Sequence, residues 1–399
     1  MDSWQSGVGS TSAVALETER ALDRRRFLVL VGGALAYSAL APAEGLAKKV
    51  RSESVALQPW TLPAQAPATS IELARAVIGA GVLAPSHWNT QPWRMETDGE
   101  VIRLVADGTR ALPVCDPDQR SMMLALGASL ENMVIALRAW GRRPSVTYFP
   151  EGDHHPTVAT IAWGGPEPAH DQMLFSAIPQ RRTNRRDYDG RGLYMESRAA
   201  LSAQIPPDLR LHWIDDRDPI HAVAEIVKAA TEAQLKNDPA QKEQFNWTRF
   251  DDQARRRGDG VNFDDMDFSG PASWFGAHTF NPKGLFERFG VGNAIRKARG
   301  AVRSAGALAL LTTPASSPLG WVNAGQAWER FALRATSLGI AHQPLHAPIE
   351  AVRFHGDLLR AFGAAPGEQP LMFARLGHAK QPHASVRRAV AMVASFRNS

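Results

Sequence analysis

Cysteine is almost absent from this chain: Cys115 is the single one among 399 residues. One thiol cannot form an internal disulfide, and an exposed thiol is a liability in an oxidising compartment, so we expect Cys115 to be buried. Cysteine and histidine also show no spacing typical of metal ligands, and no metal site is expected. The cluster at residues 153–155, Asp-His-His, has no partner ligands at helical spacing and predicts a surface turn.

Long apolar runs and blocks of like charge are also missing. The apolar run over residues 27–40 is 14 residues long and contains two glycines, too short and loose for a stable membrane span. A net charge of +5 and a pI near 9.5 would fit a nucleic-acid partner, but acidic residues are interspersed with the basic ones. We therefore expect no nucleic-acid partner. A hydrophobic content of 44% is typical of a globular protein, and 399 residues predict two domains or one duplicated domain.

The first 50 residues are typical of a targeting segment. The sequence DRRRFL at residues 23–28 leads into the apolar run, and ALAPA at residues 39–43 supplies small residues at cleavage spacing. This pattern resembles a twin-arginine export signal. It predicts a signal peptide over residues 1–43, the twin-arginine export machinery as a partner, and a periplasmic or cell-envelope location. An uncleaved membrane anchor or a disordered basic tail is the alternative. The three prolines of residues 44–68 predict an extended linker.

Hydrophobic periodicity predicts the elements that follow. Thr69-x-x-Glu72 is a capping-box pattern, and apolar residues at helical intervals predict a helix that ends before Pro85. A long apolar helix is predicted over residues 121–140, with Gly141 as its stop. A further helix is predicted over residues 219–236, and strands over residues 101–106, 209–213, 307–311 and 371–376.

The most constraining stretch is APSHWNTQPW at residues 84–93, which follows the first helix and precedes a predicted strand. Two prolines stiffen it, while Ser86, Asn89 and Gln91 can read the edge of a planar heterocycle or a polyol without adding charge. For any one of these residues, a polar connection with a buried tryptophan is the alternative. The combination nevertheless predicts a binding loop.

As they stand, these residues resemble the Pro-Ser-x-x-Asn-x-Gln-Pro-Trp signature of the nitroreductase superfamily, and specifically its Acg-like branch of long single chains. Weaker resemblance extends from about Ile71 to Arg388. The resemblance implies a nitroreductase-like α+β fold, with mixed or antiparallel sheets flanked by helices, and FMN as the cofactor. It also implies that Ser86, Asn89 and Gln91 approach the flavin, because in family members this segment comes from the neighbouring subunit of a dimer.

Residues 180–188, QRRTNRRDY, resemble the family's amino-terminal Arg-x-Ser/Thr-x-Arg/Lys segment. Guanidinium groups bind phosphate in a bidentate manner, and a hydroxyl or backbone N–H can complete the site. A solvated basic turn is the alternative. Together with two basic residues near the carboxyl terminus, the implied phosphate ligands are Arg181, Arg182, Thr183, Arg185, Arg387 and Arg388.

Residues 338–347, LGIAHQPLHA, resemble the family's Leu-Gly-x-x-x-x-Pro-Ile-x-Gly turn, whose backbone N–H groups approach flavin N5. The resemblance implies cofactor contacts from Pro344 and Leu345 and catalytic N–H donors at His346 and Ala347, which stabilise charge at N5 without a side-chain acid. The chain departs from the family at these last two positions, where Glu or another residue and then Gly are usual. His346 either adds positive charge near the ring or has a structural role.

Two predicted helices share a pattern. In residues 127–141 and in residues 325–339, a Glu follows the first Gly by four residues and a terminal Gly follows it by fourteen. The first half, residues 69–170, carries the Asn/Gln loop, and the second half, residues 171–399, carries the Arg segment. We infer an internally duplicated, single-chain pseudo-dimer with one complete FMN site. A monomer or a higher homo-oligomer of such chains fits equally.

Residues 237–297 scatter aromatic residues among Gly, Pro and charges, which predicts either a lid over the pocket or an insertion that packs on the core. The expected function is that of an exported FMN-dependent oxidoreductase that passes electrons to a small electron-poor acceptor, such as a nitroaromatic or a quinone, with NAD(P)H as a candidate donor. Nicotinamide nucleotides are scarce outside the cytoplasm, so an FMN-sequestering protein without turnover is the alternative. A basic exported binding module without cofactor is the third hypothesis.

Overall fold

The computed structural model of the chain describes residues 59–250, 252–262 and 285–397. The predicted signal peptide, most of the predicted linker and the middle of residues 237–297 lie outside these ranges. Within them, Cys115 is buried as predicted, and burial raises the pKa of its thiol. Residues 153–155 form the predicted exposed turn.

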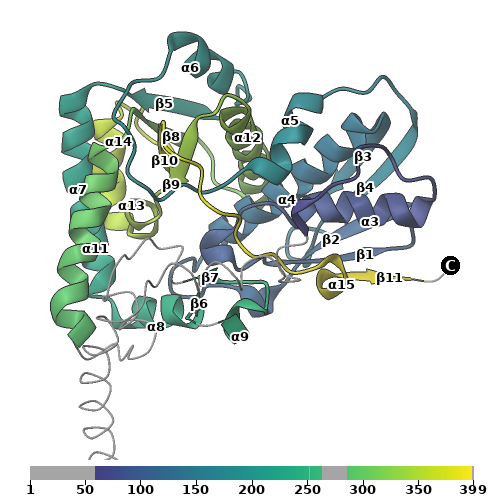
Figure 1. Cartoon of the computed structure of the whole chain (residues 1–399), viewed down its shortest axis with the longest axis horizontal. Coiled ribbons are helices and arrows are strands. Elements are labelled where there is room, and N and C mark those ends of the chain that lie inside the picture. The colour runs from purple at the N-terminus through teal and green to yellow at the C-terminus, as the bar shows by residue number, and fades with distance from the viewer. Residues whose placement is uncertain (1–58, 251, 263–284, 398–399) are drawn as a thin grey trace, which may run out of the picture. The chain divides into compact units, whose positions relative to one another are not determined.

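Two main sheets carry the fold (Figure 1). The first has the order β11-β1-β2-β4-β3, and the second has the order β5-β8-β10-β9. Every pair in them is antiparallel except β1 with β11, so the predicted mixed or antiparallel sheets of an α+β fold are confirmed. The strands, with the short parallel pair β6 and β7, are β1 Trp93–Thr97, β2 Val101–Ala106, β3 Arg142–Tyr148, β4 Thr157–Pro166, β5 Arg210–Ile214, β6 Thr248–Arg249, β7 Val261–Asn262, β8 Ala307–Thr313, β9 Ala341–Pro344, β10 Gln369–Gly377 and β11 Ala394–Phe396.

Helices flank both sheets. The predicted first helix is confirmed as α3, and its capping residue is the predicted one, because the Thr69 hydroxyl accepts a hydrogen bond from the Glu72 backbone N–H at 3.3 Å. The described helices are α3 Ser70–Gly81, α4 Arg120–Ala139, α5 Gln172–Ala177, α6 Met195–Ser202, α7 Arg217–Leu235, α8 Asp238–Asn246, α9 Asp252–Arg255, α11 Leu285–Arg303, α12 Pro318–Ser337, α13 Ala347–Glu350, α14 His355–Ala361 and α15 Val390–Val393.

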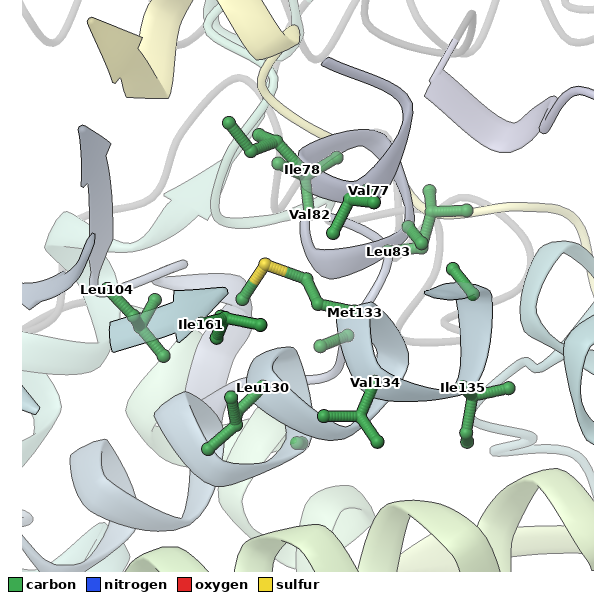
Figure 2. Close-up of a cluster of buried hydrophobic side chains, with 14 of the residues drawn as sticks. Val77, Ile78, Val82, Leu83, Leu104, Leu130, Met133, Val134, Ile135 and Ile161 are labelled. Carbon is green, nitrogen blue, oxygen red and sulfur yellow. The ribbon is translucent and has the colours of Figure 1, made fainter. Parts of the chain in front are cut away.

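The core of the first half lies between α3, α4 and the first sheet. Figure 2 shows Met133 of α4 among Val77 and Ile78 of α3 and the strand residues Leu104 and Ile161, all fully buried. By length and composition α4 could cross a membrane, but 89% of its apolar window is buried inside this fold. The apolar sequence of α4 is therefore explained by its position as a core helix.

The two halves repeat one arrangement. Each runs in the order strand, strand, 20-residue helix, strand, strand: β1, β2, α4, β3 and β4, then β5, β8, α12, β9 and β10. The strands also take the same order across each sheet. Each long helix is followed by a left-handed glycine, Gly141 with φ 68° and Gly339 with φ 69°. This repetition is what an internal duplication predicts.

The long helices α4 and α12 cross at their paired glycines. A Cβ atom on Gly127 would lie 2.1 Å from the Val322 carbonyl oxygen, and one on Gly325 would lie 2.1 Å from the Leu124 carbonyl oxygen. Each helix therefore contacts the same position on the other. Reciprocal contact of this kind defines the isologous interface of a two-fold dimer, here formed within one chain.

The halves differ in one connection and at one edge. Residues 98–100 join β1 to β2, whereas residues 215–306 join β5 to β8, so the second half carries a long insertion with α7, α8, α9 and α11. At the other end of the chain, β11 leaves the second half and pairs with β1 of the first half (Figure 1). Segments of the second half thus reach the motif loop from two sides.

Candidate functional site

A cavity of about 390 Å³ is lined by both halves, a volume within the usual range of ligand pockets, about 300–1,000 Å³. The loop at residues 84–93 and the Arg segment, which are remote in sequence, both contribute to its wall. The structure thus brings most of the predicted site residues together. Those that line the cavity are Ser86, Asn89, Arg181, Arg182, Thr183, Arg185, Pro344, Leu345, His346, Ala347 and Arg387.

The motif loop is held in an unusual backbone conformation. Trp88, Asn89 and Gln91 have φ values of 45°, 56° and 51°, a region that side chains larger than glycine rarely adopt. The Ser86 hydroxyl accepts a hydrogen bond from the Gln91 N–H at 2.8 Å and closes the loop. Such conformations persist only where the surroundings determine them, and they concentrate at functional sites.

The side-chain amide of Asn89 forms its hydrogen bonds with other residues of the chain. Its Nδ2 donates to the carbonyl oxygens of Gly260 at 2.9 Å and Val386 at 3.1 Å, and its Oδ1 accepts from Arg387 at 2.9 Å. Asn89 therefore fixes the cavity wall by joining the motif loop to the insertion and to the carboxyl-terminal segment. Its lining position matches the prediction, but its amide does not point to a free hydrogen-bonding edge.

Gln91 and Arg388 do not line the cavity. The Gln91 amide donates to Gly258 O at 2.8 Å and accepts from the Arg388 N–H at 3.0 Å, and the Arg388 guanidinium donates to Trp93 O at 3.0 Å. These bonds turn both side chains away from the cavity and tie the carboxyl-terminal segment to the loop. In the described structure both side chains support the loop from behind, and their contact with the cofactor stays a prediction.

The Arg segment runs beside β9. Thr183 forms a parallel bridge with His342, and the Asn184 N–H donates to His342 O at 3.0 Å. From β10, the fully buried Arg375 donates to Ala301 O at 2.9 Å and to Arg186 O at 2.7 Å. Arg375 therefore fixes the main chain of the segment. Sequence reasoning missed it, although an arginine inside an apolar strand was a usable signal.

Positive charge accumulates on one side of the cavity. The Arg182 and Arg387 guanidiniums lie 4.0 Å and 4.9 Å from the Trp60 ring centroid. Burial first, and then Arg181, lowers the pKa of Arg182 to about 10. Burial also lowers the pKa of Arg387 well below its usual value, followed by the charges of Arg181 and Arg182. An anion bound here would relieve this repulsion, because opposite charge favours the charged form of each guanidinium.

Arg181 lies deepest in this group and faces a carboxylate behind the wall. Its Nε is 3.5 Å from Glu329 Oε1, and its NH2 donates to Leu83 O at 3.2 Å. Burial raises the pKa of Glu329 to about 7, and the opposing influence of Arg181 does not offset it. Desolvation thus outweighs attraction for this pair, as is common for buried ion pairs.

The turn after β9 presents two backbone donors at the cavity. Leu345 N donates to Phe373 O at 2.8 Å, whereas the N–H groups of His346 and Ala347 donate to no acceptor in the described part of the chain. Both residues line the cavity. Their amides are therefore available to a ligand, as the predicted N5 donors must be.

A cluster that the sequence did not predict lies on the same wall. The rings of His87 and His346 stack with centroids 4.2 Å apart, and His87 Nε2 lies 2.9 Å from Glu350 Oε1. Burial lowers the pKa of His346 well below its usual value, with His87 as the next cause. Because the two histidines are far apart in sequence, motif spacing could not reveal this cluster.

The insertion is anchored to the motif loop. Gly260 N donates to Asn89 O at 3.1 Å, and the Asp259 carboxylate pairs with Arg249 at 2.7 Å and with Arg110. Insertion residues Val227, Gln234 and Val261 line the cavity. The described part of the insertion therefore contributes to the wall, while its role as a lid stays a prediction.

No family model matches the chain, but curated relatives do. A Mycobacterium tuberculosis protein provisionally named NAD(P)H nitroreductase Rv3131 is 29% identical over 316 residues, which are 77% of this chain and 86% of that protein. The chain is therefore similar to proteins that are named as nitroreductases. A second protein from that organism, provisionally named NAD(P)H nitroreductase acg, is 28% identical to this chain over 116 residues, which are 29% of this chain and 35% of that protein.

Solved structures that are similar to this chain match it at lower sequence identity. An FMN-bound nitroreductase from Desulfitobacterium hafniense is 16% identical, with a TM-score of 0.32 over 53% of this chain and 93% of that chain. The FMN-dependent nitroreductase NfnB from Mycobacterium smegmatis, in complex with NADPH, is 17% identical, with a TM-score of 0.35 over 57% of this chain and 99% of that chain.

Proposed function

We propose that the chain is an FMN-dependent oxidoreductase of the nitroreductase type, in the Acg-like branch, that passes electrons through bound FMN to an electron-poor small molecule such as a nitroaromatic or a quinone. The observation that carries the proposal is the single cavity lined by the loop at residues 84–93 from the first half and by the Arg segment from the second. The names of the relatives and the 86% coverage of Rv3131 support it.

The lining residues fit FMN group by group. Arg182 and Arg185, with the Thr183 hydroxyl, suit the phosphate, because all three residues line the cavity and guanidinium groups bind phosphate oxygens in a bidentate manner. The N–H groups of His346 and Ala347, which have no acceptor among the described residues, suit a ring atom that gains charge on reduction. FMN itself would supply the two-electron redox chemistry, and the chain would bind it, orient it and control access to it.

A second candidate, FMN sequestration without turnover, is favoured by the anchored insertion. Asn89 and Gly260 exchange two hydrogen bonds, and Gln91 donates to Gly258, so the insertion closes one side of the cavity through three bonds to the motif loop. A donor such as NAD(P)H needs access to the ring. A wall fixed in this way favours retention of the cofactor over exchange of substrates.

Absorbance spectroscopy separates the two candidates. Yellow purified protein that NADPH bleaches and a nitroaromatic reoxidises supports the oxidoreductase. Yellow protein that NADPH leaves unchanged but dithionite reduces supports sequestration. Colourless protein that takes up no FMN on titration contradicts both candidates and leaves a binding module without this cofactor.

Export through the twin-arginine pathway is part of the proposal, with a periplasmic or cell-envelope location. It rests on the Arg24-Arg25-Arg26 run and the apolar residues behind it, and a folded protein with bound cofactor is the usual cargo of this route. A variant in which uncharged residues replace Arg24, Arg25 and Arg26 should stay in the cytoplasm as the full-length chain. Unchanged cell fractionation of that variant would contradict the export signal.

A further inference from the structure

Three side chains of the types that ligate metal ions converge on the cavity wall. His87 comes from the motif loop, His346 from the start of α13 and Glu350 from its end. One potential ligand atom from each lies within 4.8 Å of the other two. All three residues line the cavity, so the cluster faces a space that a ligand can enter.

Part of the hydrogen-bonding capacity of this cluster is not used within the described chain. The His87 side chain is 3% exposed, yet neither of its ring nitrogens has a hydrogen-bond partner there, and Glu350 Oε1 has none either. His87 Nε2 and Glu350 Oε1 are 2.9 Å apart in an orientation that makes no hydrogen bond. Buried polar groups without partners are rare, and an ion is one of the few explanations for them.

We propose that His87, His346 and Glu350 bind one divalent transition-metal ion of the Zn²⁺ class. Two imidazole nitrogens and one carboxylate oxygen form a donor set that Zn²⁺ and its transition-metal neighbours prefer, whereas Mg²⁺ and Ca²⁺ prefer oxygen ligands alone. A cation at the centre of the cluster satisfies the unpartnered nitrogen and oxygen together. It also offsets the cost of burying a carboxylate beside two imidazoles.

One outer group already orients the carboxylate ligand. Gln234 of α7 donates from Nε2 to Glu350 Oε2, which leaves Oε1 to face the cluster. A hydrogen bond to the second oxygen of a carboxylate holds this kind of metal ligand in its binding geometry.

The site has the composition of a reactive metal centre. Three protein ligands leave at least one coordination position, and this position opens onto a cavity of about 390 Å³. The proposal goes beyond FMN binding and does not depend on it, since it uses the imidazole of His346, whereas the proposed flavin contact uses the backbone N–H of the same residue.

Zn²⁺ titration of the full-length chain tests the site. The protein is stripped of metal with a chelator and then titrated with Zn²⁺ alone, with calorimetry for affinity and elemental analysis for content, both with and without added FMN. We expect one Zn²⁺ per chain and a higher thermal midpoint in its presence. His87→Ala and Glu350→Gln should each weaken binding by about 100-fold or more, and Gln234→Ala by about 10- to 100-fold.

His154→Ala is the matched control, because this histidine is fully exposed beside Asp153 and should leave the affinity unchanged. The proposal is overturned if the wild-type chain binds no Zn²⁺, if Glu350→Gln binds as tightly as wild type, or if His154→Ala removes the binding. Should His87→Ala fail to fold, the isosteric Glu350→Gln and the outer Gln234→Ala carry the test. If the wild-type chain binds Zn²⁺ but no FMN, the proposed function is contradicted and the metal site is supported.

Discussion

Individual arginine side chains determine the affinity of the cavity for an anion. Arg182 and Arg185 line it, and a charged hydrogen bond to phosphate contributes about 1.5–3 kcal/mol, so each contact strengthens binding by roughly tenfold or more. We expect the double variant Arg182→Ala and Arg185→Ala to raise the Kd for FMN by about 100-fold or more, measured by fluorescence titration of the stripped protein. Arg191→Ala is the control, because this arginine is exposed and pairs with Asp189. Equal retention in both variants would refute the phosphate assignment.

Glu329 makes stability depend on pH. Its folded pKa of about 7 exceeds the ordinary 4.5, so the folded chain binds the proton more tightly than the unfolded chain. Stability from this group is full below pH 4.5 and falls as the pH rises to about 7, by about 3 kcal/mol in total. Glu329→Gln should flatten that part of the profile in urea unfolding at several pH values. A wild-type slope that survives in the variant would assign the dependence to another group.

Sequence patterns predict which residues gather at the cavity better than they predict what each side chain does there. The motifs identified Ser86, Asn89 and the Arg segment as lining residues, because main-chain placement follows from the elements on either side. They could not show that Gln91 and Arg388 bond to each other, since positive φ angles at Trp88, Asn89 and Gln91 set the directions of the loop's side chains. No pattern in the sequence encodes those angles.

Helices and strands with one clear hydrophobic period are predictable, and mixed ones are not. The predicted strand over residues 101–106 is β2, and the predicted helix over residues 121–140 is α4 within one residue at each end. No strand is predicted over residues 142–166, where β3 and β4 form. β3 alternates between half-buried and exposed positions and contains Pro144, while β4 ends at two glycines, so neither has a continuous apolar face.

The crossing of α4 and α12 tolerates no side chain at its paired glycines. A Cβ on Gly127 would overlap the Val322 carbonyl, so Gly127→Ala must separate two long helices that both bury their apolar faces. We expect a loss of about 3 kcal/mol or more in the free energy of unfolding, read from chemical denaturation. Gly300→Ala in α11 is the control, because its Cβ would meet nothing within 4 Å. Equal stability of the two variants would mean that the helices do not cross as closely as described.

At the scale of the whole molecule, the two halves repeat one arrangement of strands and helices but differ around the cavity. Glu329 of α12 and Glu131 of α4 occupy equivalent positions in the two halves. Glu329 faces Arg181 behind the cavity wall, whereas Glu131 accepts hydrogen bonds from Arg330 at 2.9 Å and from Gln326 at 2.8 Å. The described first half has no arginine segment at the equivalent place, so the second position is filled by contacts between α4 and α12.

This asymmetry predicts one FMN per chain, not two. The bound flavin is released by denaturation, measured by its absorbance, and divided by the chain concentration from amino-acid analysis. We expect a ratio near one for the wild-type chain. The double variant Arg182→Ala and Arg185→Ala should lose most of the bound flavin. A ratio near two would require a second pocket that lacks these arginines. Native mass spectrometry of the same sample then shows whether one chain holds the flavin or whether two chains share it, since the motif loop and the Arg segment already meet within a single chain.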